Sequence, residues 1–377
     1  MQTEFNHLRE QILQAASKGT QLTIQGGGSK AFYGEQVATD HILDTNAYSG
    51  IVEYDAPELV ITARCGTPLL EIEAALAEKG QMLAFEPPHF GKHATIGGAV
   101  AAGLSGPRRP HAGAVRDFIL GTKLLNGKGE HLEFGGQVMK NVAGYDVSRL
   151  LTGSMGTLGL ITEVSLKVLP RSVASKTVVF DYDVHTALKQ LNAWMGRPLP
   201  ISGTLWQDGQ LYVRFSGARA AVDYAIEVLG CTLVDNDFAD GLWADLREHQ
   251  LPFFNERSDK QTLWRIAVPD TAPYFDLGGS QIVEWGGSLR WVNTQTDAQT
   301  VRDLTARHGG HATAFKGAQA GVPVFTPAAN AHLAIQQRLK NAFDPAHIFN
   351  IGRLYPQVLI KRPVKDKNEE NTSCKRL

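Results

Sequence analysis

The sequence contains little cysteine, and the cysteines it has are far apart. The 377 residues include only Cys65, Cys231 and Cys374, and no two of them form a CxxC pair. Zinc ribbons, iron–sulfur clusters and thiol redox motifs are built from such closely spaced cysteines, so the pattern indicates none of them. A chain without a disulfide framework is typical of a reducing compartment, and we therefore expect a cytoplasmic protein.

The sequence also has no excess of positive or negative charge and no long apolar run. Lys and Arg total 37 and Asp and Glu total 38, which leaves a net charge of −1 and no basic footprint for nucleic acid. No run of about 18 apolar residues predicts a membrane span. The first residues, Met1–Phe5, lack the basic-then-apolar layout of a signal peptide. The remaining composition, 43% hydrophobic and 20% charged, is that of a globular protein.

Two common nucleotide-binding fingerprints are absent as well. The P-loop spacing GxxxxGK[ST] does not occur in the first glycine-rich loop, Gly26–Lys30. No glycine-rich loop reads GxGxxG with an acidic residue about 20 positions later, as the doubly wound dinucleotide fold requires. The sequence therefore favours neither a P-loop nucleotidase nor a protein of the doubly wound fold.

Glycine, by contrast, is abundant and concentrated in three loops. There are 38 glycines, about 10% of the chain against a usual ~7%. The loops are Gly26–Lys30 after a predicted strand, Ala94–Ala101, and Gly153–Gly159 before another predicted strand. Backbone N–H groups bind a pyrophosphate at glycine because only glycine lets the backbone approach closely or adopt a positive φ. Taken singly, each loop is equally consistent with an ordinary turn.

The pattern along the chain indicates two domains and no internal repeat. Residues 86–113 show neither helix nor strand period and predict a long ordered loop, which in a compact domain is usually functional. After Pro170 strands and helices alternate with ordinary loops, which predicts a second α+β domain. The expected units are a first domain at 1–171, a second at 172–325, a segment at 326–356 that returns to the first domain, and a disordered tail at 357–377.

In this order, the three loops resemble those of flavoproteins of the vanillyl-alcohol oxidase and p-cresol methylhydroxylase (PCMH) type. The resemblance is carried by Gly26–Ser29, by Thr95–Ala101, and by Gly156–Val164. It implies an α+β fold in which a PCMH-type FAD-binding domain of two α/β subdomains holds FAD between them. A second α+β domain would cap the flavin and form any substrate cavity. The first two loops would wrap the pyrophosphate, and the strand after the third would run past the flavin.

Further segments are similar to a narrower group within this family. Lys140–Leu150 looks like a segment of the glycolate oxidase and D-lactate dehydrogenase branch. Gly106–Pro110 and Asp344–Arg353 are similar to the FAD-binding E subunits of bacterial glycolate oxidases, and that similarity runs nearly end to end. The flavin would be bound non-covalently, because Gly28 stands where some relatives carry the histidine that tethers it.

The resemblance implies oxidation of glycolate to glyoxylate within an oxidase complex. The partners would be a catalytic FAD subunit and an iron–sulfur subunit that receives the electrons, with the complex cytoplasmic or peripheral at the inner membrane. Two alternatives stay open. The chain could be a non-catalytic FAD-binding or electron-relay subunit, or a stand-alone FAD-dependent oxidoreductase of another substrate.

Two departures from the larger catalytic subunits bear on these alternatives. Met155 stands where those subunits carry an acidic residue, and the histidine-rich metal signature is reduced to His308-Gly309-Gly310-His311. Two histidines at i and i+3 without nearby carboxylates make a poor metal site, so no metal is expected. The departures favour a subunit that holds FAD without turning over the hydroxy acid itself.

The expected site residues fall into two sets. Arg290, His311 and Lys316 are candidates for a carboxylate anchor, a base and an anion anchor, although a strand surface or core role is the simpler interpretation of Arg290. Arg108 is equally consistent with a solvated turn or a flavin pyrophosphate contact. The expected cofactor-binding residues are Gly26, Gly27, Gly28, Ser29, Lys30, Pro88, Thr95, Gly97, Gly98, Ala101, Gly103, Arg108, Tyr145, Gly156, Gly159, Ile161, Asn350 and Arg353.

Overall fold

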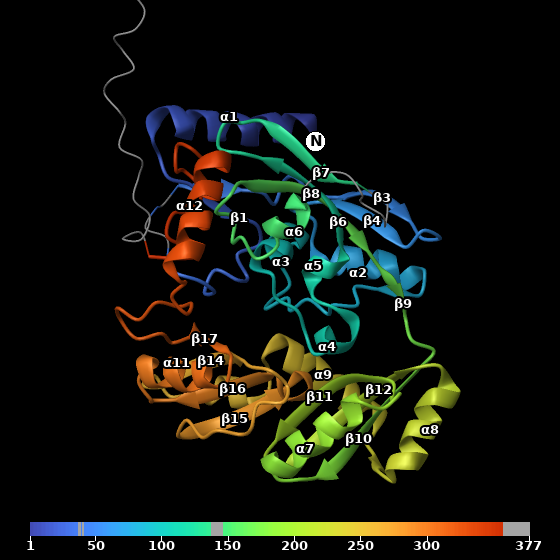
Figure 1. Ribbon diagram of the computed structural model, residues 1–377. Coiled ribbons are helices and arrows are strands. Elements are labelled where there is room, and N and C mark those ends of the chain that lie inside the picture. Colours follow the sequence, from blue (N-terminus) through green and yellow to red (C-terminus); the bar gives the residue numbers. More distant parts are fainter. Residues whose placement is uncertain (37–38, 40, 137–145, 357–377) are drawn as a thin grey trace, which may run out of the picture.

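The computed structural model describes residues 1–36, 39, 41–136 and 146–356 and folds them into two lobes (Figure 1). The chain builds most of the first lobe, crosses to the second between β9 (Leu169–Pro170) and β10 (Ala174–Asp181), and returns after β17 (His311–Lys316). The predicted tail at 357–377 lies outside the described residues. No helix in the described part of the chain is both long and apolar enough to cross a membrane.

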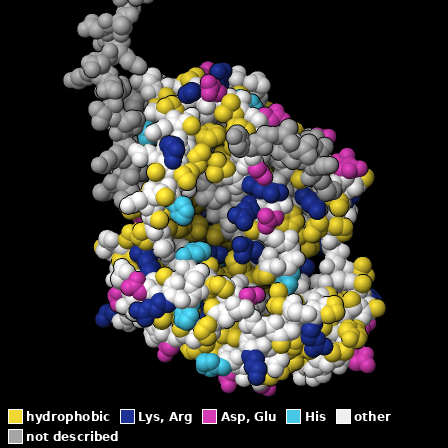
Figure 2. Space-filling model, in the orientation of Figure 1, with side chains coloured by type: hydrophobic (Ala, Val, Ile, Leu, Met, Phe, Trp, Pro, Cys, Tyr) yellow, Lys and Arg dark blue, Asp and Glu magenta, His cyan; other side chains and the backbone are white. Residues whose placement is uncertain are grey.

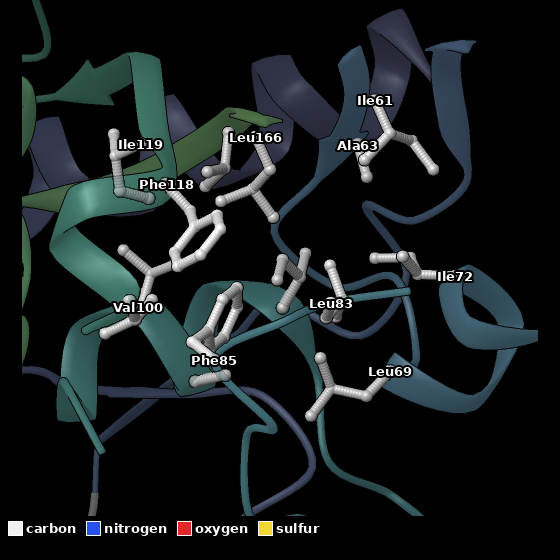
Figure 3. Close-up of a cluster of buried hydrophobic side chains, with 14 of the residues drawn as sticks. Ile61, Ala63, Leu69, Ile72, Leu83, Phe85, Val100, Phe118, Ile119 and Leu166 are labelled. Atoms are coloured by element: carbon white, nitrogen blue, oxygen red, sulfur yellow. The ribbon is translucent and has the colours of Figure 1, made fainter. Parts of the chain in front are cut away.

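A five-stranded antiparallel sheet forms the larger half of the first lobe. Its order is β3-β4-β8-β6-β7, and β8, the strand expected after the third glycine loop, is buried along nearly its whole length. The helices α2, α3, α5 and α6 accompany the sheet, and side chains such as Ile72, Phe85 and Val100 fill its core (Figure 3). The bounds are β3 (Ile51–Asp55), β4 (Val60–Arg64), α2 (Leu69–Glu78), β5 (Gln81–Met82), α3 (Ile96–Ala102), α4 (Arg109–Ala112), α5 (Val115–Phe118), β6 (Ile119–Leu125), β7 (His131–Gly135), α6 (Val147–Leu151) and β8 (Leu160–Lys167).

The smaller half of the first lobe combines the two ends of the chain. The parallel pair β1 (Thr23–Gln25) and β2 (Ile42–Asp44) lies beside α1 (Gln2–Lys18) and α12 (Asn330–Phe343). A bridge from Leu22 to Phe349 attaches the C-terminal segment to the start of β1. The segment after α12 therefore packs on the first lobe.

The second lobe is one antiparallel sheet of eight strands, in the order β13-β10-β12-β11-β15-β16-β14-β17. One face packs under α7, α8 and α11, and the other faces the first lobe. The bounds are α7 (Val184–Met195), β11 (Ile201–Gln207), β12 (Gln210–Gly217), α8 (Arg219–Leu229), β13 (Thr232–Leu233), α9 (Asn236–Glu248), α10 (Pro252–Asn255), β14 (Thr262–Ala267), β15 (Gly279–Glu284), η1 (Trp285–Gly287), β16 (Leu289–Thr294) and α11 (Ala298–Arg307).

This sheet contains a repeat of topology that the sequence does not show. In the first half, β10 to β13, the first and third strands lie side by side and the second and fourth flank them. The second half, β14 to β17, has the same arrangement, and the halves join where β11 pairs with β15. Residues 268–278, between β14 and β15, form no helix where the first half has α7. The two halves share their strand arrangement but differ in this helix. The expectation of no internal repeat holds for the sequence and fails for the topology of the sheet.

The expectation for residues 86–113 is also wrong in part, because this segment contains α3 and α4. Glycine at positions 97 and 98 gives α3 a low intrinsic helix propensity, so its periodicity is hidden. Tertiary packing compensates, since Ile96, Ala99 and Val100 are almost fully buried. The α+β class and the two-lobed arrangement are confirmed.

Candidate cofactor site

The three glycine loops meet around one pocket in the first lobe, with an empty volume of about 920 Å³. The end of β1, the start of α3, the segment before β8 and the C-terminal segment all reach it. Its lining comprises Thr23, Ile24, Gln25, Gly26, Gly27, Gly28, Ser29, Lys30, Ala31, Thr45, Cys65, Thr95, Gly97, Gly98, Ala101, Ala102, Met155, Gly156, Gly159, Leu160, Ile161, Asn350 and Arg353.

The first loop supplies free backbone donors to this pocket. Within the described residues, the N–H groups of positions 27 to 30 make no hydrogen bond. The loop is also pressed against its neighbour, since a Cβ on Gly27 would lie 1.5 Å from the carbonyl oxygen of His93. A row of unpaired N–H groups on a glycine loop is a cradle for an anion such as a diphosphate.

The second loop forms a wall of the pocket through the start of α3. The hydroxyl of Thr95 caps this helix by accepting from the Gly98 N–H at 3.3 Å. The Gly97 N–H donates to the Cys65 carbonyl at 2.9 Å, and a Cβ on Gly97 would lie 2.6 Å from the Cys65 Cβ. The N–H groups of Gly97 and Gly98 are therefore already hydrogen-bonded within the chain. The second loop contributes a wall without side chains, which lets a ligand come close to the backbone.

The third loop is held in place by the C-terminal segment. The side chain of Asn350 accepts from the Ile24 N–H at 2.8 Å and donates to the Met155 carbonyl at 2.6 Å. Arg353 donates to the carbonyls of Lys30 and Ala31 at 3.3 and 2.7 Å. The hydrogen bonds of Asn350 position the third loop against β1, and those of Arg353 position the first loop.

Lys30 brings a positive charge to the edge of the pocket. Its ammonium group donates to the His89 carbonyl at 3.2 Å and lies 5.6 Å from the centre of the Phe90 ring. Burial lowers the pKa of Lys30 to about 8, although the charge of Glu248 opposes this effect. Lys30 therefore remains mostly charged at neutral pH, and its partly desolvated ammonium group favours the binding of an anion.

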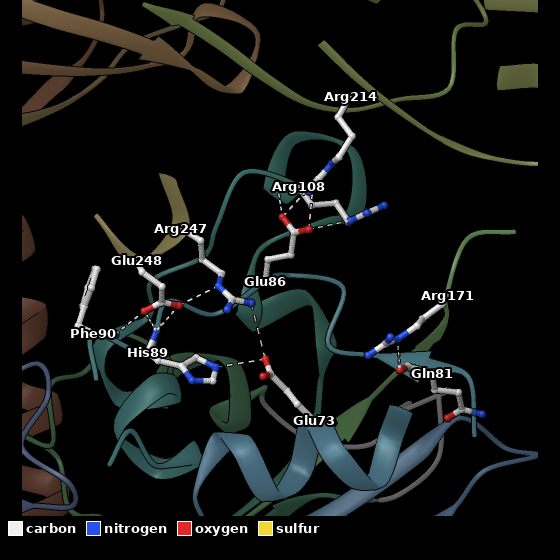
Figure 4. A network of polar contacts seen from close by, with 10 residues as sticks. All are labelled: Glu73, Gln81, Glu86, His89, Phe90, Arg108, Arg171, Arg214, Arg247 and Glu248. Carbon is white, nitrogen blue, oxygen red and sulfur yellow. Dashed lines mark hydrogen bonds and ion pairs between the residues drawn. The ribbon is translucent and has the colours of Figure 1, made fainter. Parts of the chain in front are cut away.

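A network of ion pairs and hydrogen bonds joins the second lobe to the first (Figure 4). Glu86 accepts from Arg214 of β12 at 2.9 and 3.0 Å and pairs with Arg108 at 3.3 Å. On α9, the Glu248 carboxylate accepts from the backbone N–H groups of His89 and Phe90. Burial alone would raise the pKa of Glu86, but the two arginines outweigh it and the net shift is downward. The lobes are thus joined by charged groups as well as by apolar packing.

A second, smaller cavity lies between the two lobes, with an empty volume of about 340 Å³. Figure 2 shows Lys, Arg and His side chains around the hollow that separates the lobes on this face. Pro88, Phe90 and Leu104 line the cavity from the first lobe, and His249, Arg265, Glu284, Trp291 and Phe315 line it from the second.

Comparison with known proteins gives the family. The family described as FAD binding domain matches residues 4–135. The glycolate oxidase subunit GlcE of Escherichia coli (strain K12) is 49% identical over 351 residues, which cover 93% of this chain and 97% of that protein. The chain belongs to the GlcE family. The resemblance read from the loops is confirmed.

More distant relatives share only part of the GlcE-family chain. The glycolate oxidase subunit GlcD of Bacillus subtilis (strain 168) and a D-lactate dehydrogenase of Anaerostipes hadrus are each 35% identical over 133 residues, 35% of this chain and 28% of theirs. Among solved structures, an alkyldihydroxyacetonephosphate synthase aligns with a TM-score of 0.63 at 15% identity, over 91% of this chain and 74% of that one. This last likeness shows the fold alone.

The pocket fits the FAD that membership of this family implies. The 920 Å³ space runs past the unpaired N–H groups of the first loop, the natural place for a diphosphate. The thiol of Cys65 also lines it, and burial raises the pKa of this thiol to about 12, so it stays neutral. The family match and the relatives show FAD as the cofactor, so the expected cofactor is confirmed.

The structure brings most of the expected cofactor residues of the GlcE-family chain into the pocket, but not all. Pro88 lines the second cavity instead, and Arg108 pairs with Glu86. Gly103 ends α3 and packs against Gly153, where a Cβ would lie 2.9 Å from the Gly153 Cα. Tyr145 lies outside the described residues.

The expected catalytic residues are scattered. The guanidinium of Arg290 donates to the carbonyls of Ala272 and Pro273 at 2.6 and 2.8 Å, on the helix-covered face of the sheet. His311 is exposed at the start of β17. Lys316 does reach the interface between the lobes, 5.0 Å from the Phe32 ring. The assignment of Arg290 as a carboxylate anchor is wrong, because side chains alternate along a strand and its neighbours Leu289 and Trp291 face the first lobe.

Sequence reasoning missed several residues of the pocket. Thr45 follows β2, which is parallel to β1, so the ends of both strands meet at one edge and Thr45 comes beside the first loop. A parallel pairing of the two short strands would have predicted this. Met155 lies within the third loop, which was expected at the site, whereas Thr23, Gln25 and Cys65 carry no comparable local signal.

Proposed function

We propose that this chain is the FAD-binding subunit of a glycolate oxidase complex that oxidises glycolate to glyoxylate. The observation that carries the proposal is the 49% sequence identity to GlcE, which extends over 97% of that protein. The pocket with free backbone donors at the first loop supports it. When bound, FAD supplies a two-electron acceptor for oxidation of the hydroxy acid. The complex would be cytoplasmic or peripheral at the inner membrane.

The residues of this chain divide the work of holding FAD non-covalently. The N–H groups of positions 27 to 30 would hold the diphosphate, and Lys30 would add a charge beside them. Gly97, Gly98 and Ala101 give the close wall of α3. Asn350 and Arg353 keep the first and third loops at their spacing.

The partners belong to the same proposal. The chain has no cysteine pair for an iron–sulfur cluster, so onward transfer of electrons needs a cluster-bearing partner. The names of the relatives GlcE and GlcD describe subunits of a glycolate oxidase, which supports a companion FAD subunit. The pairing of His308 with His311 gains no support as a metal site, since the described residues contain no group of three His, Cys, Asp or Glu side chains that could hold a metal ion.

The test is affinity purification of the tagged full-length chain from its own cells. We expect it to bring down a second flavoprotein and an iron–sulfur protein, and we expect glycolate to bleach the flavin of the assembled complex without oxygen. Isolation as a lone flavoprotein whose flavin glycolate does not reduce would contradict the proposal and favour another substrate.

A further inference from the structure

A carboxylate of the second lobe holds a short loop of the first lobe. Glu248, in the last turn of α9, accepts from the backbone N–H of His89 at 3.1 Å and from that of Phe90 at 2.8 Å (Figure 4). Within the described part of the chain, neither N–H group has another hydrogen-bond partner. We call residues 88–90 the strap. No described residue of the second lobe lines the pocket that fits FAD, so Glu248 contacts the strap from outside the cofactor site.

The strap needs such a contact because of the backbone conformation of Phe90. Its φ is +52°, in the left-handed region that few residues other than glycine adopt. A conformation of this kind persists only where the surrounding structure fixes it. On the side of the first lobe, the imidazole of His89 lies 3.2 Å from the carboxylate of Glu73 on α2. Glu73 and Glu248 therefore hold the strap from opposite lobes.

The strap in turn holds the ammonium group of Lys30 at the edge of the FAD pocket. The carbonyl of His89 accepts from this group at 3.2 Å, and the centre of the Phe90 ring lies 5.6 Å from it. An ammonium group has three donors, and this is the one hydrogen bond that it makes among the described residues. Two donors thus remain for a ligand beside the free N–H groups of positions 27 to 30. A shift of the strap would therefore move the ammonium group.

The charge of Glu248 reaches Lys30 as well. Burial lowers the pKa of Lys30 to about 8, and the negative charge of Glu248 limits this fall. Without that charge the pKa would lie lower still, and a smaller share of Lys30 would be charged at neutral pH. Glu248 thus acts on Lys30 through the strap and through its charge. The other charged or titratable groups around Lys30 and the strap are Glu73, Arg247, His249, Lys316 and Arg353.

We propose that Glu248 is a positioning residue for FAD, through which the second lobe sets how tightly the first lobe holds the cofactor. The carboxylate fixes the strap, the strap fixes the ammonium group of Lys30, and this group pairs with the diphosphate of FAD. The inference rests on the proposed function for the place of the diphosphate. It adds a residue of the second lobe to a site that the first lobe otherwise builds.

The experiment measures the rate at which FAD leaves the purified full-length chain, followed by flavin fluorescence after dilution at pH values below and above 8. Glu248→Gln removes the charge and one of the two acceptor oxygens. We expect this variant to release FAD about tenfold faster than wild type, because the hydrogen bonds to the strap lose their charged acceptor. Asp245→Asn, an exposed position of the same helix, is the matched control and should leave the rate unchanged.

The pH profile and a double variant separate this role from a merely structural one. FAD release should speed up as the pH rises and Lys30 loses its proton, and in Glu248→Gln this acceleration should begin at a lower pH. Lys30→Met should also release FAD faster. Adding Glu248→Gln to Lys30→Met should not accelerate release further, because Glu248 acts through Lys30.

The inference is overturned by equal release rates in wild type and Glu248→Gln, by an acceleration that is the same at every pH, or by full additivity in the double variant. If Glu248→Gln does not fold, Glu248→Asp takes its place. It keeps the charge on a shorter side chain, so it should release FAD faster while keeping the wild-type pH profile. An unchanged release rate in Glu248→Asp would then overturn the inference.

The FAD content of the wild type, measured by its absorption, distinguishes this failure from a failure of the proposed function. A wild-type chain that holds FAD and is insensitive to Glu248→Gln overturns only the inference. A folded wild-type chain that binds no FAD overturns the proposed function, and the inference with it.

Discussion

Gly27 determines the backbone path of the first loop. The loop passes so near to His93 that no side chain fits at this position. The neighbouring N–H groups, from 27 to 30, are left free for a ligand by this tight course. The glycine is therefore needed for the backbone path, and the path creates the donors.

Replacement of Gly27 by alanine should abolish FAD binding. The new Cβ would meet a backbone oxygen at 1.5 Å, so the loop must move and its donors leave their places. The measurement is the ratio of flavin to protein absorption after purification. Gly241→Ala is the control, since a Cβ there meets nothing within 4 Å, and it should retain FAD. Normal FAD content in Gly27→Ala would contradict the assignment of this loop.

Glu284 gives the stability of the protein a pH dependence. Its ordinary pKa is 4.5, and burial raises the pKa to about 7 in the folded protein. The folded state therefore holds an extra proton between these values, and stability falls as the pH rises from 4.5 to 7. The loss is on the order of 3 kcal/mol when the acid is fully ionised.

Glu284→Gln should remove most of this slope, because the amide keeps an acceptor for Trp291 and carries no charge. Denaturant unfolding at several pH values measures it, with the exposed Glu256→Gln as a control that keeps the slope. An unchanged slope in Glu284→Gln would show that other groups cause the pH dependence.

At the scale of elements, α12 and the segment after it clasp the first lobe through one buried ammonium group. Lys340 donates to the carbonyls of Thr157 and Phe349 at 2.6 and 2.8 Å and to the carboxylate of Asp344 at 2.6 Å. Asp344 in turn accepts from the N–H groups of Ile348 and Phe349. The clasp connects the third loop, the helix and the segment that carries Asn350.

Lys340→Met should destabilise the protein by about 3 kcal/mol or more, because it leaves the Asp344 carboxylate buried without its cation. The measurement is the free energy of unfolding in denaturant. Arg338→Met, on the exposed side of the same helix, should change it by less than about 0.5 kcal/mol. Equal effects of the two substitutions would rule out the clasp.

The elements also show where sequence reasoning succeeded and where it failed. The strand expected after the third loop and the alternating strands and helices expected after Pro170 are both present, and β8 begins at Leu160, directly after that loop. The helix α3 was missed because packing against Cys65 and the sheet, not propensity, stabilises it. Arg290 was assigned wrongly because the face of each strand that meets the first lobe depends on contacts far apart in the sequence.

On the scale of the whole molecule, the two lobes have separate tasks. The first carries the pocket that fits FAD, and its loops were predictable because glycine marks each of them in the sequence. The second presents one face of its sheet to the first lobe and buries Leu263, Ile282 and Trp291 against Ala102 and Leu104. The resemblance implied that the second domain forms any substrate cavity, but the residues that line the cavity between the lobes could not be assigned from local patterns, since they meet only where the lobes pack together.

The central claim is that this chain binds FAD in the pocket between its glycine loops. The most direct measurement is the visible spectrum of the purified full-length chain, followed by release and quantification of its flavin. The account predicts a folded protein with an equimolar amount of FAD that is released by denaturation, because the attachment is non-covalent. A folded chain that contains no flavin and takes none up from added FAD would contradict it.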